Sequence, residues 1–350
     1  MHVIGGETLL LKERAAEVTD SSFIQVKNLV KYFPIFSRGV LTKKQMGQVH
    51  AVDNISFDIN KQETFALVGE SGCGKTTTAR VVLNLIEPTS GEVFVDGENI
   101  FDKFKSPNKE EKLKLRRKMQ MIFQNPYGSL DPRMTVSDII SEPLIIHKTV
   151  SKECRSERVY ELLKLVGLEE YHAERYPHEF SGGQRQRICI ARALAVEPEF
   201  IVADEPVSSL DVSIRAQILN LLADLQKTMG LSFLYISHDL SSVRQVSQRV
   251  AVMYLGEIVE LAGTDELFDN SLHPYTQALI EAVPIPDPKV KNIKARLRGE
   301  VPSPINPPSG CRFNPRCPRA KAGCAERKPE LMEVRKGHFV SCEQAWQGAK

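Results

Sequence analysis

The stretch Gly69-Glu70-Ser71-Gly72-Cys73-Gly74-Lys75-Thr76-Thr77 decides the fold of this chain. It follows the pattern G-x-x-x-x-G-K-[ST], the loop with which nucleotide hydrolases bind phosphate. The apolar residues 63–69 predict a buried strand before the loop, and residues 75–86 predict a helix after it. Glycines let successive N–H groups face phosphate oxygens, and the helix N-terminus adds partial positive charge. Lys75 is expected to reach the β- and γ-phosphates, and Thr76 to ligate Mg²⁺.

Length and composition indicate a globular protein that does not cross a membrane. The 350 residues suggest roughly two domains of ~150 residues each. A net charge of +2 gives no bulk argument for nucleic-acid binding. The sequence has no apolar run of about 18 residues, the length expected of a membrane-spanning helix. Residues 1–22 lack the pattern of a signal peptide, so they predict a flexible tail on a cytoplasmic protein.

The sequence predicts further strands before the phosphate loop and a group of helices after it. Residues 23–33 and 49–59 predict strands, the second half-buried and antiparallel because Ile55, Phe57 and Ile59 alternate with polar residues. Residues 135–176 predict helices within a helical subdomain at about 125–180. The expected apolar helix faces comprise Val136, Ile139, Ile140, Leu144, Ile145, Val159, Leu162, Leu163 and Val166.

Four polar residues at strand ends are candidates for the chemistry. The apolar strand 200–204 ends in Asp204, which is expected to hold Mg²⁺, and Glu205, which is expected to act as general base. Gln124 ends another predicted strand, where it could meet the metal or the attacking water. His238 follows the buried strand 231–237, at the edge of an α/β sheet where ligands bind.

A second anion-binding helix start lies at Ser181-Gly182-Gly183-Gln184, where Ser181 is a good N-cap. One chain rarely needs two such sites for one γ-phosphate. We therefore expect this turn to contact the nucleotide held by another copy. The aromatic residues Tyr32 and Phe33 end the first strand, and either could stack on an adenine ring or simply belong to the core.

Four of the seven cysteines, Cys311, Cys317, Cys324 and Cys342, crowd the last forty residues. In a cytoplasmic chain such a cluster suggests metal ligation before disulfides. Four thiolates suit either a [4Fe–4S] cluster or Zn²⁺, and the spacing C-x5-C-x6-C-x17-C alone slightly favours zinc. A proline-rich connector, residues 273–310, leads to this segment.

Together these motifs resemble the ATP-binding subunit of ABC transporters. The resemblance implies an α/β P-loop nucleotide-binding domain at 23–262, with a RecA-like core, an antiparallel β subdomain and a helical insertion, followed by a four-cysteine extension at 263–350. It also identifies Phe33 as the adenine-stacking aromatic, with Tyr32 as its competitor. The motifs in order are the Walker A loop at 69–77, the Q-loop residue Gln124, the signature at 180–184 with Phe where many members have Leu, Walker B ending at Asp204 with catalytic Glu205, the D-loop with Ser209 and Asp211, and the switch residue His238.

Residues 121–133 and 273–279 are similar to the oligopeptide/dipeptide importer branch, and within it to the second, F-type ATPase of a heterodimeric pair. This implies an ATPase that powers peptide import on the cytoplasmic face of the membrane. The implied partners are a second ATPase subunit, two permease subunits and, indirectly, a solute-binding protein. The implied cofactors are ATP, Mg²⁺ held by Thr76, Gln124 and Asp204, and a [4Fe–4S] cluster on the four cysteines.

Several alternatives remain open from the sequence. The solute could instead be nickel, glutathione or an oligosaccharide. A soluble ABC ATPase acting on DNA or ribosomes is disfavoured because the chain has one cassette and no sustained heptad pattern before Ser181. A partner that binds ATP without hydrolysing it is disfavoured by Glu205 and His238. The cysteine segment could be a structural staple or a redox sensor.

Overall fold

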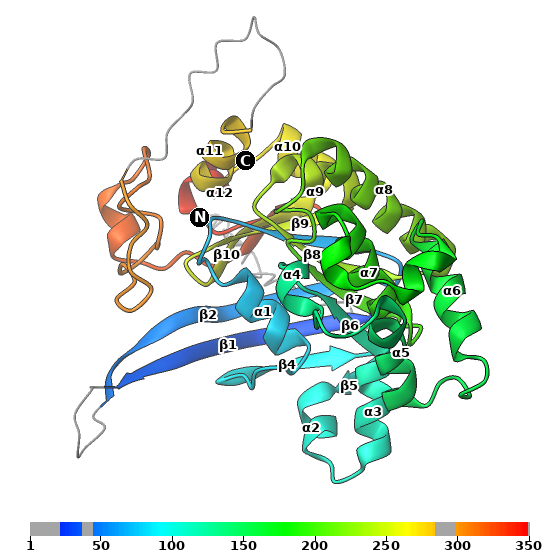
Figure 1. The fold of residues 1–350 in the computed structure, drawn as a ribbon. Helices are drawn as coiled ribbons and strands as arrows, with labels where there is room; N and C mark the ends of the chain where they lie inside the picture. Colours follow the sequence, from blue (N-terminus) through cyan, green and yellow to red (C-terminus); the bar gives the residue numbers. More distant parts are fainter. Residues whose placement is uncertain (1–21, 37–44, 284–298, 349–350) are drawn as a thin grey trace, which may run out of the picture.

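The computed structural model describes residues 22–36, 45–283 and 299–348 (Figure 1). The strands are β1 (Ile24–Phe36), β2 (Gln45–Ile59), β3 (Thr64–Val68), β4 (Ser90–Val95), β5 (Glu98–Asn99), β6 (Met119–Ile122), β7 (Phe200–Asp204), β8 (Ser232–Ser237), β9 (Arg249–Tyr254), β10 (Glu257–Gly263), β11 (Met332–Arg335) and β12 (His338–Val340). The helices are α1 (Lys75–Val82), α2 (Ile100–Lys105), α3 (Lys109–Lys118), α4 (Pro126–Ser129), α5 (Val136–His147), α6 (Arg155–Leu165), α7 (Gly182–Leu194), α8 (Val212–Met229), α9 (Leu240–Val246), α10 (Thr264–Asp269), α11 (Pro274–Glu281) and α12 (Glu343–Gly348), with 3₁₀ turns η1 (Glu170–Glu174), η2 (Pro177–Glu179) and η3 (Ala322–Ala325). The predicted tail at 1–21 and part of the proline-rich connector lie outside the described residues.

The central sheet is buried on both faces. Its strand order is β11-β12-β10-β9-β3-β8-β7-β6, and β9, β3, β8, β7 and β6 run parallel. Along β3, Ala66 and Val68 join the apolar core shared with α5 to α8, whereas Phe65 and Leu67 join the core shared with β1, β2 and α1. The near-continuous apolar sequence of β3 is typical of a parallel strand with both faces covered.

A smaller antiparallel sheet, in the order β2-β1-β4-β5, covers one face of the central sheet (Figure 1). Phe57 pairs with Val26 across β1 and β2, and its ring stacks on Phe65 of β3 with centroids 5.1 Å apart. Ile55, Phe57 and Ile59 are all buried, which confirms the predicted alternation of this strand.

The helices α4 to α7 lie on the other side of the central sheet, in green in Figure 1. Helix α5 begins at Thr135, whose side chain accepts a hydrogen bond from the Asp138 N–H. The predicted apolar residues of α5 and of the α6 region are buried, with one exception. Ile145 is 49% exposed, because the buried stripe of α5 ends on Leu144 and leaves Ile145 on its solvent side.

Helix α1 is shorter than the sequence predicted, since it ends at Val82 instead of residue 86. Asn84 adopts a left-handed conformation (φ 48°), which ends a helix. The guanidinium group of Arg116 donates hydrogen bonds to the carbonyls of Leu83 (2.6 Å) and Asn84 (3.0 Å). A distant side chain thus satisfies carbonyl groups beyond the helix end, a contact that local sequence does not reveal.

The residues after the connector pack against the preceding fold. Strand β12 pairs with β10 and so extends the central sheet, and β11 forms the new edge. Phe313 is 1% exposed and packs against Tyr254 of β9 and Tyr275 of α11. The C-terminal segment, defined as residues 299–348, therefore gains its apolar burial by docking onto the preceding fold.

His338 anchors the β11–β12 hairpin. The His338 side chain is fully buried, and its Nε2 and Nδ1 atoms lie 2.8 Å and 3.1 Å from carboxylate oxygens of Glu260 and Glu266. Burial alone would lower the pKa of His338, but the hydrogen bonds to both carboxylates outweigh it and raise this pKa. Both nitrogens face acceptors, so the protonated imidazolium ring is the form that fits the pocket.

A pH dependence of stability follows. The pKa of His338 is higher in the folded chain than in the unfolded chain, where it is about 6.5. The contribution of His338 to the free energy of unfolding is therefore fully present below the unfolded pKa, and it is lost as pH rises through the folded pKa. The H338Q variant leaves Glu260 without its cation, so we expect it to lower the free energy of unfolding by about 3 kcal/mol at pH 6. Thermal unfolding of the wild type and H338Q from about pH 6 to 9 measures the difference, which should shrink as pH rises. The exposed His178 provides the control H178Q; a wild-type-minus-H338Q difference independent of pH would contradict the assignment.

Candidate nucleotide-binding and hydrolysis site

The phosphate loop, residues 69–77, joins β3 to α1. Gly69, Gly72 and Gly74 all have positive φ. A Cβ on Gly69 would lie 2.1 Å from the carbonyl oxygen of Met253, and one on Gly74 would lie 2.1 Å from that of Ala51. Only glycine fits at these two positions, because the neighbouring backbone approaches so closely.

The other loop residues surround the turn that the glycines make. Ser71 and Gly72 are exposed at the loop tip, Cys73 is buried, and Thr76 and Thr77 are half-buried in the first turn of α1. The Lys75 ammonium group donates to the carbonyls of Gly69 (2.8 Å) and Glu70 (3.0 Å) and lies 3.7 Å from Cys73 Sγ. The lysine is 5% exposed. A phosphate group bound at the start of α1 would lie near Lys75 and the N-terminal N–H groups of this helix.

Oxygen ligands for a hard cation lie beside the loop. The Thr76 hydroxyl donates to Oδ1 of Asp204 at 3.1 Å. Asp204 is 2% exposed, and this burial raises the pKa of its carboxyl group. Hydroxyl and carboxylate oxygens are the ligands that Mg²⁺ prefers, and a cation would offset the burial of the carboxylate. The pair therefore fits Mg²⁺.

Two predicted catalytic residues, Gln124 and His238, contact the carboxylate of the third, Glu205. Gln124 Nε2 donates to Glu205 Oε2 at 2.7 Å, and Nδ1 of His238 lies 3.0 Å from Glu205 Oε1. Glu205 follows β7, Gln124 follows β6 and His238 follows β8, so neighbouring parallel strands deliver all three to one edge. Glu205 has φ 45°, an uncommon conformation for a residue other than glycine. The amide nitrogen of Gln124 faces Glu205, while its predicted Mg²⁺ contact stays a prediction.

The signature turn forms the N-terminus of α7, and its capping hydrogen bonds lie within the first turn of that helix. Ser181 caps α7 by accepting from the Gln184 N–H, and Gln184 Oε1 accepts from the Ser181 N–H. A Cβ on Gly183 would lie 2.3 Å from Cγ2 of Ile214, so this glycine lets α7 approach α8 closely. In the part of the chain that the structure describes, the hydrogen bonds of Ser181 stay in the first turn of α7.

The D-loop residues lie between Glu205 and α8. The Ser208 hydroxyl donates to the Glu205 carbonyl at 3.1 Å, and Asp211 occupies the N-cap position of α8. Arg215 of α8 pairs with Asp239 at 2.9 Å and so joins this loop to the strand end that carries His238. Ser209 lies within this loop, and its predicted role stays a prediction.

The structure separates the two aromatic candidates. The Tyr32 hydroxyl donates to Asp53 at 2.6 Å, and the tyrosine ring lies 4.2 Å from that of His50. Burial and the contact with Asp53 raise the Tyr32 pKa to about 12. The Phe33 ring is engaged only by Lys31 among the ring contacts of the described residues, with the ammonium 4.9 Å from its centroid. Phe33 is therefore the freer of the two for an adenine ring.

The four clustered cysteines lie in one neighbourhood without forming a metal site. Burial raises the pKa of Cys311 to about 12, and the charges of Cys342, Cys317 and Cys324 contribute to this rise. Among the described residues, no group of three or more His, Cys, Asp or Glu side chains is arranged to hold a metal ion. The four-cysteine metal site predicted from the sequence is therefore not confirmed.

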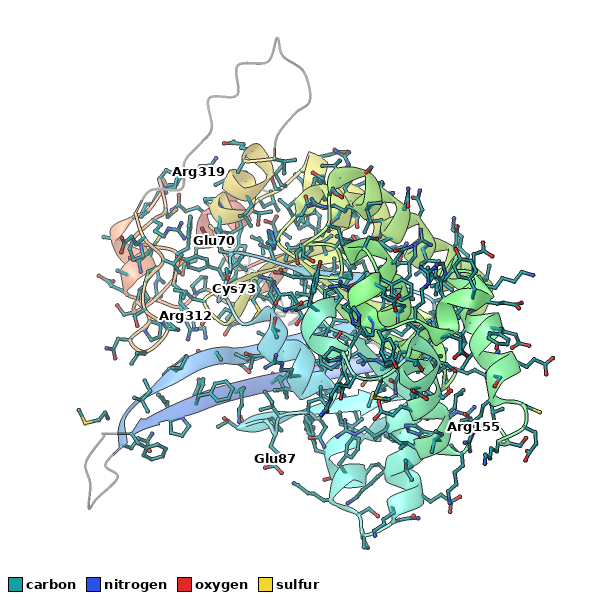
Figure 2. All side chains as sticks on the ribbon, in the orientation of Figure 1. Glu70, Cys73, Glu87, Arg155, Arg312 and Arg319 are labelled. Atoms are coloured by element: carbon teal, nitrogen blue, oxygen red, sulfur yellow. The ribbon has the colours of Figure 1, made fainter. Side chains whose placement is uncertain are left out.

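Sequence reasoning missed the residues that contact the phosphate loop from the far end of the chain. The Arg316 guanidinium group pairs with the Glu70 carboxylate, and the Tyr275 hydroxyl accepts from the Glu70 N–H. Figure 2 shows Glu70 and Cys73 on the same side of the molecule as Arg312 and Arg319, well away from Arg155. No local pattern could reveal these contacts, because about 200 residues or more separate the partners.

A phosphate loop, an oxygen pair that fits Mg²⁺ and a carboxylate held at the sheet edge define a P-loop nucleotide hydrolase. The family described as "ABC transporter" matches residues 52–208, and that described as "Oligopeptide/dipeptide transporter, C-terminal region" matches residues 259–324. The chain is 51% identical to the oligopeptide transport ATP-binding protein AppF of Bacillus subtilis, over 92% of this chain and 97% of that protein. The chain belongs to the family of ATP-binding proteins of oligopeptide and dipeptide ABC transporters, and it is an ABC ATPase.

Other relatives agree with this family. The dipeptide transport ATP-binding protein DppF of Haemophilus influenzae is 48% identical, over 90% of this chain and 94% of that protein. Among solved structures, the dimeric post-hydrolysis state of the ATP-binding cassette MJ0796, bound to ADP and Pi, is similar with a TM-score of 0.60 and 31% identity, covering 69% of this chain and 98% of that chain. Within the described residues of the present chain, no helix combines the length and apolar character needed to cross a bilayer.

Proposed function

We propose that this chain hydrolyses ATP to power a membrane importer of dipeptides or oligopeptides, as one of two ATPase subunits. The observation that carries the hydrolytic role is the Glu205 carboxylate, which Gln124 and His238 hold at 2.7 Å and 3.0 Å beside the phosphate loop. The peptide substrate rests on the names of the relatives, which are transport ATP-binding proteins for oligopeptides and dipeptides.

The residues divide the chemistry among them. Lys75 and the N–H groups of residues 69–77 would hold the phosphates, while Thr76 and Asp204 would hold Mg²⁺. Bound MgATP would supply the phosphoryl group that passes to water. Glu205 would orient the attacking water and accept its proton, and His238 and Gln124 would fix the direction of the carboxylate. In the folded chain Lys75 bonds to loop carbonyls, which it would exchange for phosphate oxygens.

Two ATPase subunits would share each nucleotide. Ser181 and the N–H groups at the start of α7 form an exposed anion-binding turn whose internal bonds leave its outward face available. We infer that this turn contacts the nucleotide bound by the second ATPase subunit, so that the γ-phosphate bridges the two. The related MJ0796 cassette is a dimer with ADP and Pi bound, which supports such an assembly for the present chain.

The E205Q variant tests the hydrolytic role. The amide keeps the size of the side chain but cannot accept a proton, so we expect hydrolysis to fall by about 100-fold or more while MgATP binding persists. With ATP bound and not cleaved, the two ATPase subunits should stay associated, as measured by light scattering. Replacing Lys75 by Ala is the comparison, because it should weaken binding and abolish the association. Hydrolysis by E205Q at the wild-type rate would remove Glu205 from the mechanism.

A groove beside the hydrolysis site is the proposed contact for a permease subunit. This groove of about 630 Å³ lies between α5, β6 and the end of α1. Leu85, Phe123 and Ile146 line it and are 39–56% exposed, and Gln124 and Asp204 also belong to its lining. An amphipathic cytoplasmic helix of the permease would cover the apolar residues. Such docking would place the chain at the cytoplasmic face of the membrane and next to Gln124.

A matched pair of variants tests the groove. Ile145 and Ile146 are adjacent on α5 and similarly exposed, at 49% and 56%, but only Ile146 lines the groove. A carboxylate in an apolar contact costs several kcal/mol, so I146D should strongly reduce co-purification with permease subunits from membranes, whereas I145D should not. MgATP binding should be unchanged in both variants. Recovery of the wild-type chain with ribosomes instead of membrane proteins would favour the soluble ABC ATPase alternative.

We also propose, on the family resemblance, that Cys311, Cys317, Cys324 and Cys342 ligate a [4Fe–4S] cluster, with Zn²⁺ as the alternative. Their gathering in one neighbourhood supports this, although the described side chains are not arranged as a metal site. Ligation would require deprotonation of buried thiols, so it would depend on pH. Its function would be structural, alongside the contacts that already dock the segment.

Anaerobic purification distinguishes the two metals. With a [4Fe–4S] cluster the protein should be brown, with a broad visible absorption band and about four iron atoms per chain. A fourfold Cys→Ser variant should be colourless and provides the control. A colourless wild-type protein with one zinc per chain would support Zn²⁺, and a metal-free protein would overturn both assignments.

A further inference from the structure

All polar groups of Glu70, the second residue of the phosphate loop, are bound. Its N–H donates to Tyr275 Oη at 2.9 Å, and its carbonyl accepts from Lys75 Nζ at 3.0 Å. Its carboxylate accepts two hydrogen bonds from Arg316, at 2.6 Å and 3.0 Å, one on each oxygen. The Glu70 carbonyl also accepts from the Cys73 N–H at 3.3 Å. Two of these partners, Tyr275 and Arg316, lie after position 270, so the far end of the chain helps to fix this loop residue.

Arg316 belongs to a short turn that is firmly inserted into the nucleotide-binding part. We call residues 311–317 the cysteine turn. Arg312 pairs with Asp53 and with Glu257, Phe313 is buried against Tyr254, and the Arg316 side chain is 5% exposed. The three side chains anchor the turn beside the loop, and Cys311 and Cys317 form its two ends.

The Arg316–Glu70 ion pair reduces the electrostatic repulsion between the phosphate loop and a bound nucleotide. A carboxylate within a phosphate-binding loop repels the negatively charged phosphates. The Arg316 guanidinium cancels that charge with a planar, two-bond contact that also fixes the direction of the carboxylate. The hydrogen bonds that Arg316 donates to Glu70 raise the pKa of Arg316 further, so the cation persists at every physiological pH.

We propose that Arg316 is a positioning residue of the nucleotide site: through Glu70 it holds the phosphate loop in its binding shape and neutralises the loop's own negative charge. ATP affinity therefore depends on the cysteine turn being folded against the loop. This inference rests on the proposed nucleotide site at residues 69–77. Arg316 would act through Glu70, so its role is positioning and not catalytic.

The test measures MgATP affinity and ATPase kinetics of the full-length chain. R316Q leaves the Glu70 carboxylate unpaired, so we expect the Kd and KM for ATP to rise about tenfold with kcat changed by less than about twofold. Because the added repulsion is screened by ions, the affinity gap between R316Q and wild type should narrow as salt increases. R319Q is the control: Arg319 is exposed, lies three residues away, and its replacement should leave both constants unchanged.

A double substitution separates charge cancellation from simple loss of packing. E70Q/R316Q removes both charges, so its ATP affinity should return to within about threefold of the wild type. A double variant that binds ATP as weakly as R316Q, or an R316Q variant with wild-type affinity, would overturn the inference. If the wild-type chain itself neither bound nor hydrolysed ATP, the proposed function would fail instead. Near-UV circular dichroism of each variant verifies that it is folded.

Discussion

The parallel register of four strands is the constraint on which the site depends. β3, β8, β7 and β6 lie side by side in one direction, so their carboxyl ends meet at one edge of the sheet. The residues that follow them are the phosphate loop, His238, Asp204 with Glu205, and Gln124. Hydrogen bonds of 2.7–3.1 Å then join Gln124, His238 and Thr76 to the two carboxylates. No loop needs to be long to bring these residues together.

The sequence predicted this edge well because its signals are local. A strand followed by the glycine loop, apolar strands ending in a polar residue, and Ser181 before a helix are all patterns of a few residues. The α/β nucleotide-binding fold, the buried strands and the alternating residues of β2 are as predicted, whereas the four-cysteine site of the predicted extension is not confirmed. The end of α1 is not, because Arg116 and the left-handed Asn84 set it from outside the helical pattern.

The sequence could not predict the position of the C-terminal segment. The apolar content of this segment is too low to predict a core, and its cluster of cysteines predicts metal ligation instead. The stabilising contacts are instead long-range: β12 pairs with β10, Phe313 enters an aromatic cluster, and His338 meets Glu260. The local sequence around each of these residues carries no pattern that indicates its distant partner. Contacts between residues tens or hundreds of positions apart depend on the complete fold, which a local pattern does not encode.

Nucleotide binding would affect the contact of Glu70 with Lys75 differently from its contacts with Arg316 and Tyr275. Lys75 bonds to the carbonyls of Gly69 and Glu70, and in the proposed mechanism it would leave them when it turns to a phosphate. The contacts of Glu70 with Arg316 and Tyr275 involve its carboxylate and its N–H, neither of which takes part in that exchange. These contacts could therefore persist throughout binding and release. When the loop loses its lysine bonds, the ion pair with Arg316 would still hold Glu70, and in this way the C-terminal segment would support the shape of the loop at the moment of binding.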